Sequence, residues 1–296
     1  MRRWTAAVVL LVLTAAAAAC GSTGDGQGAP APASAPTTPA PPPACHPAAA
    51  RGGVADRLEG SVDCAAPHAA ETIHSGRLSD VVAASPPAGS RALRSAFDEC
   101  DRQAAAALGG DWRTARLRLD LVLPSPAAWA AGQRWFRCDV VELTGVGPDG
   151  RVADRSGSLA GALAPGSPLL LRCALVKLDK RSNVDTVVES PCDKEHQGEF
   201  AGVWTAPDKL AYPVKDRDYV PFYQGCLETI AAYVGVPYDA SFAYRTGYIP
   251  ILAGKDTFAL DRGVRCYLWI RFRPLTASAK GVGEKGFPPN LGQFAK

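Results

Sequence analysis

The sequence predicts an α+β fold made of two homologous domains, each a small antiparallel sheet packed with one helix and held by two disulfides. Three observations lead to this prediction. Cysteines recur in two sets with similar spacing, the same short motifs surround both sets, and the third cysteine of each set lies in a helical pattern of apolar residues. A hydrophobic content of 47% is sufficient to fill two small cores.

The repeat rests on motifs as well as on spacing. The gaps are 19, 36 and 38 residues in the first cysteine set and 19, 34 and 40 in the second. In both sets, Cys-x-x-x-His-x-x-Glu begins at the second cysteine and Arg-x-x-Arg-Cys ends at the fourth, and a looser Ser-x-x-Gly pair follows. The shared order indicates a duplication. The two sets are Cys45, Cys64, Cys100 and Cys138, and then Cys173, Cys192, Cys226 and Cys266.

The pattern of apolar residues predicts one helix and several strands in each repeat. Apolar residues recur every three to four positions from Leu93 to Leu108 and from Tyr219 to Val234, and each run stops at glycine. Pro221 fits only the first turn of the second helix. Alternation with period two predicts strands at 116–123, 135–143, 169–178 and 264–272, whereas the mixed charges of 179–195 predict a solvated loop.

The disulfide pairing is predicted from side-chain facing and from the repeat. Cys226 lies on the apolar stripe of its helix, and Cys266 lies on the inward face of the last strand. A helix packed on its own sheet would bring these two together. Four cysteines allow three pairings, and the pairing that this facing favours is Cys45–Cys64, Cys100–Cys138, Cys173–Cys192 and Cys226–Cys266.

The N-terminus predicts export and anchoring. Residues 1–19 have the basic head and apolar run of a signal peptide, and the residues around Cys20 resemble the bacterial lipobox, in which cysteine is lipidated. Lipidation would leave an even eight of the nine cysteines. The alternatives are ordinary signal cleavage and a retained membrane anchor. Residues 20–44 predict a Pro/Ala-rich tether on the outer face of the cell membrane, followed by repeats at 45–165 and 166–296, the second with a C-terminal tail.

The first repeat resembles the septum-formation domain of actinobacterial lipoproteins. The resemblance is carried by Cys64, His68 and Glu71, by the helix with Cys100, and by the segment from Trp129 to Cys138. The second repeat resembles the same domain more weakly, which suggests two divergent copies. The resemblance implies a membrane-tethered extracytoplasmic protein linked by name to septation, and it implies no catalytic residues, cofactor or metal.

Two His-x-x-Glu pairs are the sharpest candidates for chemistry: His68 with Glu71, and His196 with Glu199. An imidazole and a carboxylate at this spacing can form an acid–base pair or bind a metal ion. The structural interpretation, which we prefer, is that each histidine follows a disulfide turn and supports the fold. The alternative function is an envelope hydrolase or metal-dependent enzyme that uses one of these pairs.

A binding or scaffolding module without catalytic residues is therefore the leading interpretation. Alternating aromatic and guanidinium groups on the outer face of the last strand form a candidate binding face, unless a neighbouring strand or the tail covers them. Loss of Arg2 and Arg3 with the signal peptide would change the formal charge from +3 to +1, which gives no reason to expect a nucleic-acid partner. The expected partners are the membrane, through the lipid anchor, and an envelope or division protein. The candidate face comprises Arg265, Tyr267, Trp269, Arg271 and Arg273.

Overall fold

The computed structural model describes residues 43–49, 54–55, 60–79, 85–87, 89–147, 150–180, 184–239, 242, 246–270 and 274–286. The predicted signal peptide, Cys20, nearly all of the predicted tether, and Arg271 and Arg273 lie outside these ranges. Within them, no helix has the length and apolar character needed to cross a membrane.

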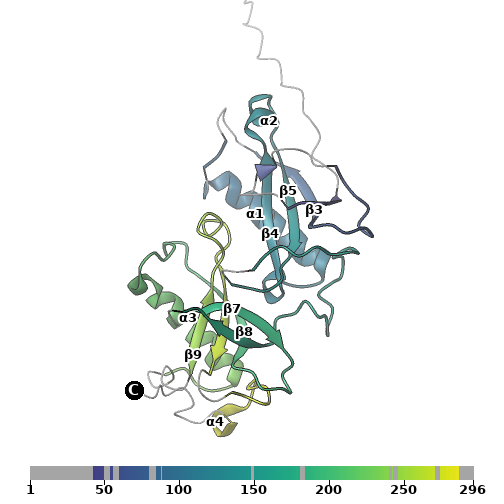
Figure 1. The fold of residues 1–296 in the computed structure, drawn as a ribbon. Helices are drawn as coiled ribbons and strands as arrows, with labels where there is room; N and C mark the ends of the chain where they lie inside the picture. The colour runs from purple at the N-terminus through teal and green to yellow at the C-terminus, as the bar shows by residue number, and fades with distance from the viewer. Residues whose placement is uncertain are drawn as a thin grey trace, which may run out of the picture. The chain divides into compact units, whose positions relative to one another are not determined.

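The first sheet has five strands in the order β1-β3-β5-β4-β2. The first four strands pair antiparallel, and β2 pairs parallel to β4 at one edge. Figure 1 shows the central strands with helix α1 beside them. The elements of this repeat are β1 Ala44–His46, β2 Val54–Ala55, β3 Ala70–Arg77, α1 Arg91–Leu108, the short 3-10 turn η1 Trp112–Thr114, β4 Leu117–Pro124, α2 Pro126–Ala130 and β5 Trp135–Glu142.

The second sheet also has five strands, in the order β7-β6-β8-β10-β9, and all its neighbours pair antiparallel. Four of these strands, in the order β6, β8, β10 and β9, correspond to β1, β3, β5 and β4 of the first sheet. The duplication inferred from the motifs is therefore visible in the topology. The elements are β6 Cys173–Leu178, β7 Val184–Ser190, β8 Gly198–Thr205, η2 Asp216–Tyr219, α3 Val220–Val234, β9 Gly247–Ile251, β10 Gly263–Trp269 and α4 Gly283–Gly286.

Strand β7 corrects the sequence prediction. The segment 179–195 was expected to be a solvated loop, but Val184–Ser190 pairs with β6 along its length. Charged residues are interspersed there with β-branched ones, and Val187 is buried beside Leu171 and Tyr267. A half-buried edge strand explains both the charges and the valines.

Each sheet is covered by one long helix, as the sequence predicts. Helix α1 packs against β3, β4 and β5, and α3 packs against β8, β9 and β10. The buried stripe of α1 includes Leu93, Phe97 and Cys100 at helical spacing. Each helix ends at a glycine in the left-handed conformation, Gly109 with φ 82° and Gly235 with φ 79°.

The four disulfides have the predicted pairing. Two of them join a helix to its sheet through the core: Cys100–Cys138 links α1 to β5, and Cys226–Cys266 links α3 to β10. The other two join the first strand of each repeat to the turn before β3 or β8, as Cys45–Cys64 and Cys173–Cys192. The mixed α+β class and the disulfides within each repeat are thus confirmed.

Candidate functional site

The two His-x-x-Glu motifs occupy equivalent places in the two sheets. His68 and His196 stand just before β3 and β8, and the glutamates lie in those strands. His68 is 1% exposed, and His196 and Glu199 are fully buried. Each histidine exchanges a pair of backbone hydrogen bonds with a later segment, His68 with Arg155 and His196 with Leu275.

Each glutamate binds the Ser-x-x-Gly turn of its own repeat. Glu71 accepts hydrogen bonds from the Ser158 hydroxyl at 2.7 Å and from the Leu159 backbone N–H at 2.6 Å. Glu199 accepts from the Ser278 hydroxyl at 3.0 Å and from the backbone N–H of Ala279 at 2.9 Å. The His-x-x-Glu and Ser-x-x-Gly motifs recur together in the sequence because the glutamate carboxylate of the first holds the backbone of the second.

The same turn also completes the end of the long helix. The N–H of Gly161 donates to the carbonyl of Ala107 at 2.8 Å, and the N–H of Gly281 donates to the carbonyl of Tyr233 at 2.9 Å. The last carbonyls of a helix have no partner within the helix. The glutamates therefore support the fold by holding a turn that caps α1 or α3.

The two histidines differ in the partner of their Nε2 atom. In both, Nδ1 lies close to a backbone carbonyl, at 2.8 Å from Ala66 and 2.7 Å from Lys194, so Nδ1 carries the hydrogen. His196 Nε2 lies 2.9 Å from Oε1 of Glu199, and two such atoms at this distance share a proton. His68 Nε2 is buried and has no hydrogen-bond partner among the described residues. Only the second pair therefore holds an extra proton.

Glu199 is surrounded by donors, which identifies it as the anion of its pair. Besides the turn, it accepts a hydrogen bond from the Tyr233 hydroxyl at 2.7 Å. Several donors favour the ionised form of a carboxylate, so His196 is the cation. Burial, together with the charge of Glu199, raises the pKa of Tyr233 and keeps that hydroxyl a donor. Helix α1 has Ala107 at the corresponding position, seven residues after its cysteine.

Each motif also approaches a cysteine sulfur. Potential ligand atoms of Cys45, His68 and Glu71 lie within 4.8 Å of one another, and those of Cys173, His196 and Glu199 do the same. Both sulfurs are in disulfides. A disulfide sulfur is not a thiolate ligand, and the remaining imidazole and carboxylate are fewer than the three or four ligands of a zinc site.

The first arginine of each Arg-x-x-Arg-Cys motif has a structural role. Arg134 lies 4.2 Å from the ring centroid of Trp129 and donates to its carbonyl at 2.8 Å. Arg262 lies 3.9 Å from the ring centroid of Phe258 and donates to the carbonyl of Leu210 at 2.6 Å. The aromatic residue before each arginine is thus a cation–π partner.

The second arginine is buried in both repeats. Arg137 donates to Asp139 at 2.9 Å, and Asp139 accepts a further hydrogen bond from Thr72 at 2.6 Å. Burial raises the pKa of Asp139, and Arg137 partly offsets this effect. The cluster is completed by His46, whose Nε2 lies 2.8 Å from the Thr72 hydroxyl.

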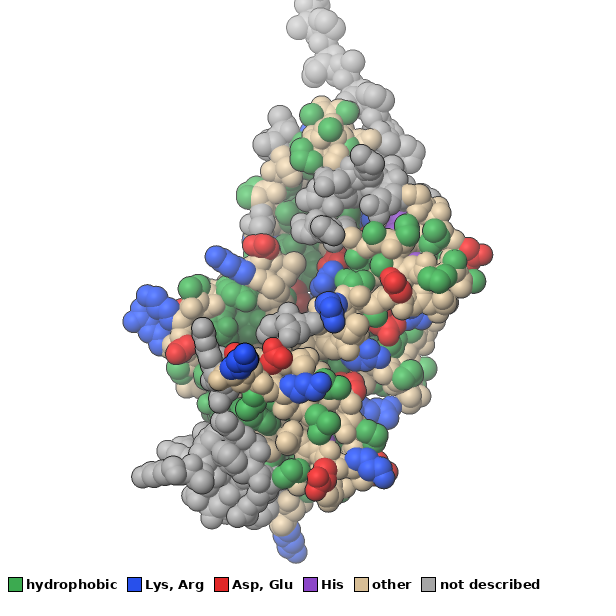
Figure 2. Space-filling view, in the orientation of Figure 1, with side chains coloured by type: hydrophobic (Ala, Val, Ile, Leu, Met, Phe, Trp, Pro, Cys, Tyr) green, Lys and Arg blue, Asp and Glu red, His purple; other side chains and the backbone are tan. Residues whose placement is uncertain are grey.

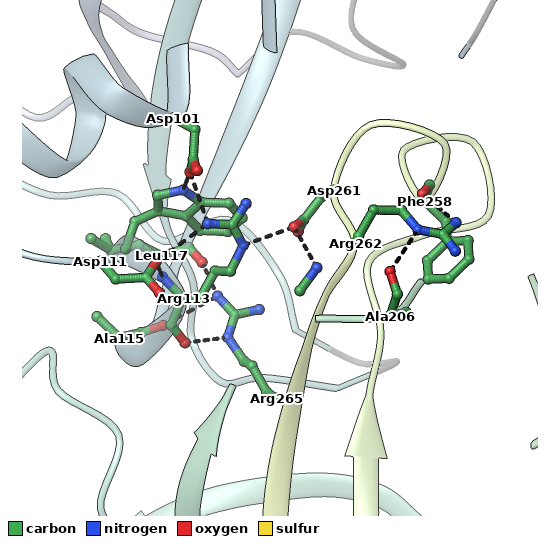
Figure 3. Close-up of polar contacts among 12 residues, drawn as sticks. Asp101, Asp111, Arg113, Ala115, Leu117, Ala206, Phe258, Asp261, Arg262 and Arg265 are labelled. Carbon is green, nitrogen blue, oxygen red and sulfur yellow. Dashed lines mark hydrogen bonds and ion pairs between the residues drawn. The ribbon is translucent and has the colours of Figure 1, made fainter. Parts of the chain in front are cut away.

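Arg265 lies between the two repeats. Its guanidinium donates to the carbonyls of Arg113 at 2.8 Å and Leu117 at 2.7 Å, with a longer contact to Ala115 at 3.4 Å (Figure 3). The acceptors lie in η1, directly after it, and at the start of β4. Burial lowers the pKa of Arg265, while Asp261 opposes the shift.

An ion pair crosses the same contact in the opposite direction. Arg113 of the first repeat donates to Asp261 of the second at 2.8 Å and to Asp101 at 2.8 Å (Figure 3). The Arg113 guanidinium also lies 4.3 Å from the ring centroid of Trp112. We refer to Arg113, Asp261 and Arg265 as the inter-repeat cluster.

The predicted exposed binding face is therefore wrong for two of its members. Arg265 is only 9% exposed because it bonds to carbonyls of the first repeat. Tyr267 is fully buried in a cluster with Val146 and Val187. Trp269 is half-buried. Sequence reasoning missed the role of Asp261, although a signal was present: it precedes Arg262, where the first repeat has neutral Gln133 before Arg134.

A cavity of about 180 Å³ lies beside the inter-repeat cluster, lined by both repeats. Its walls include Trp112, Arg118 and Leu119 from the first repeat and Ile251, Thr257 and Arg265 from the second. Arg118 is held by two hydrogen bonds of 2.8 Å to the carboxylate of Asp120. Apolar walls with a few fixed polar groups are typical of small-ligand sites at domain contacts.

These features define a disulfide-stapled α+β protein built from two joined repeats. A model of the septum formation family matches residues 42–259, well over half of the chain. The chain therefore belongs to the septum formation family. The match covers the first sheet and β6 to β9 of the second, and it ends before β10. Neither a curated protein nor a solved structure matches the chain.

Proposed function

We propose that the protein is a membrane-anchored, extracytoplasmic binding or scaffolding module that acts in septum formation without catalysing a reaction. The observation that carries this proposal is the use of the motif side chains. In both repeats the glutamate, the serine and the first arginine bond to neighbouring backbone groups. Side chains that bond to the backbone of turns and strands stabilise the fold, as expected of a scaffold.

The anchor is proposed to be a lipid on Cys20. The eight cysteines from Cys45 onward are joined in four disulfides, which leaves Cys20 as the remaining cysteine of the nine. Lipidation would use that thiol, and acyl chains bind membranes at about 0.8 kcal/mol per buried methylene. The disulfides themselves fit an oxidising compartment outside the cytoplasm.

The partner is proposed to be a protein of the envelope or the division machinery. On the face seen in Figure 2, acidic and basic side chains are interspersed rather than gathered by sign. This distribution supports a protein partner over a polyanion, which would favour a patch of one sign. The inter-repeat cluster links the two repeats by hydrogen bonds.

The experiment is in-cell crosslinking with the full-length protein, followed by identification of the crosslinked proteins. The expected result is recovery of division or envelope proteins and enrichment at the septum. The Cys20→Ser variant is the matched control, and it should lose both. A protein spread evenly along the envelope without a division partner would contradict the proposal.

Catalysis is tested separately with His196→Gln and His68→Gln. If the protein is a scaffold, variants that remain folded should retain septal enrichment and partners. Loss of septation in a folded His196→Gln variant that still binds its partner would favour the alternative, an envelope hydrolase or metal-dependent enzyme.

A further inference from the structure

The four disulfides fall into two classes of accessibility. All four cysteines of Cys100–Cys138 and Cys226–Cys266 are fully buried. In the other two bridges the inner sulfur belongs to a buried residue, Cys45 or Cys173, whereas the outer residue, Cys64 or Cys192, is half-buried in a turn. A thiolate from solution can reach only a bridge whose outer sulfur is exposed.

Only one accessible bridge has a hydrogen-bonded His–Glu pair near its inner sulfur. Cys173 lies within 4.8 Å of the potential ligand atoms of His196 and Glu199, the pair that shares an extra proton. Potential ligand atoms of Cys45 and His68 also lie within 4.8 Å, but Nε2 of His68 carries no proton in the tautomer that its Nδ1 contact requires. The two bridges therefore match in position and exposure and differ in the proton.

We propose that Cys173–Cys192 is an exchangeable disulfide that accepts electrons from a dithiol, with the His196–Glu199 pair as the proton donor. The dithiol first loses a proton to water. Its thiolate attacks Sγ of Cys192, a mixed disulfide forms, and the Cys173–Cys192 bond breaks. The electron pair of that bond goes to Sγ of Cys173, which takes the proton from the imidazolium.

The second thiol of the dithiol completes the exchange. As a thiolate it attacks its own sulfur partner in the mixed disulfide, and Cys192 leaves and is protonated by water. The dithiol becomes a disulfide, the protein gains two thiols, and the His196–Glu199 pair recovers its proton from solvent. The leaving thiolate controls such steps, so protonation of Cys173 accelerates the first one.

The groups facing the proton donor are fixed. Glu199 supplies the negative charge, and the Tyr233 and Ser278 hydroxyls bond to that carboxylate from α3 and from the segment after β10. Because these partners keep Glu199 ionised, the shared proton resides on the imidazole, from which it can pass to the sulfur.

The test is timed reduction of the full-length protein by dithiothreitol at pH 7 under native conditions. Samples are quenched with acid and alkylated, and each bridge is followed by peptide mapping. The expected order is Cys173–Cys192 first, Cys45–Cys64 at least about tenfold slower, because a positioned acid contributes about 100-fold or more, and the two core bridges last. The core bridges report unfolding within the same molecule.

The variant His196→Gln keeps a polar group but cannot donate the proton. It should slow reduction of Cys173–Cys192 about tenfold or more. The His68→Gln variant should leave the reduction rate of Cys45–Cys64 within about twofold of the wild-type rate, because the tautomer of His68 places no proton on Nε2. If His196 had only a structural role, Cys173–Cys192 would instead be reduced faster in His196→Gln than in the wild type. Equal rates for the two outer bridges, reduction together with the core bridges, or no slowing in His196→Gln would each overturn the proposal. If His196→Gln does not fold, the order in the wild-type chain decides.

Discussion

Replacing Arg265 by alanine is expected to uncouple the two repeats. The guanidinium makes two short hydrogen bonds to carbonyls of the first repeat, with Arg113 at 2.8 Å and Leu117 at 2.7 Å. A hydrogen bond from a charged group contributes about 1.5–3 kcal/mol. The two bonds together give an expected loss of at least about 3 kcal/mol in the free energy of unfolding.

The assay is scanning calorimetry combined with urea unfolding of the disulfide-intact protein. The wild type should unfold in one transition because the inter-repeat cluster couples the repeats. The Arg265→Ala variant should show two transitions, since each repeat retains its own core disulfide. The matched control is Arg262→Ala, because Arg262 also donates to backbone carbonyls, but only within the second repeat.

The control should lower the unfolding free energy without separating the transitions. A loss in Arg265→Ala below about 1 kcal/mol, the level of an exposed ion pair, together with one unchanged transition, would refute the reasoning. That result would mean that the apolar contacts alone hold the repeats together.

Three further predictions concern Tyr267, the two motif glutamates and Cys20. The buried Tyr267 hydroxyl has no hydrogen-bond partner among the described residues, so Tyr267→Phe should raise stability in thermal melts at pH 7 by about 1 kcal/mol. Burial raises the Tyr267 pKa, so its contribution is present below about pH 10 and is lost above it, and the phenylalanine variant should lose less stability in melts above pH 10. In urea unfolding, Glu71→Gln should lower stability by about 1–3 kcal/mol and Glu199→Gln by about 3–5 kcal/mol, because only Glu199 balances a buried imidazolium; equal losses would contradict the assigned charges. Cys20→Ser should move the protein from the membrane fraction to the soluble fraction, and the wild-type chain should begin at an acylated Cys20 by intact mass.

The elements that follow from a periodic pattern could be predicted from the sequence. The helix from Leu93 to Leu108 lies within α1, and the alternation at 116–123 and 135–143 gives β4 and β5 to within a residue or two at each end. The disulfide pairing also followed, because the facing of Cys226 and Cys266 is a local property of helix and strand.

The parts that depend on contacts between distant segments could not be predicted. Arg265 has the alternation of an outward-facing residue, and nothing in its neighbourhood shows that η1 covers it. The strand β7 was missed because its charges outweighed its valines in a local interpretation. The two histidine motifs have the same spacing, so the sequence did not show that only His196 contacts its glutamate, which also accepts from Tyr233 of another element.

The inter-repeat cluster also bears on the order of folding. Arg265 and its acceptors on the first repeat are about 150 residues apart along the chain, and contacts of such separation form slowly. During synthesis from the N-terminus, η1 and the start of β4 are complete long before β10 exists, so the carbonyls of Arg113 and Leu117 lack their Arg265 partner until that strand is made. A chain interrupted before Gly263 would therefore lack the inter-repeat hydrogen bonds, whereas its first repeat would keep its own core disulfide.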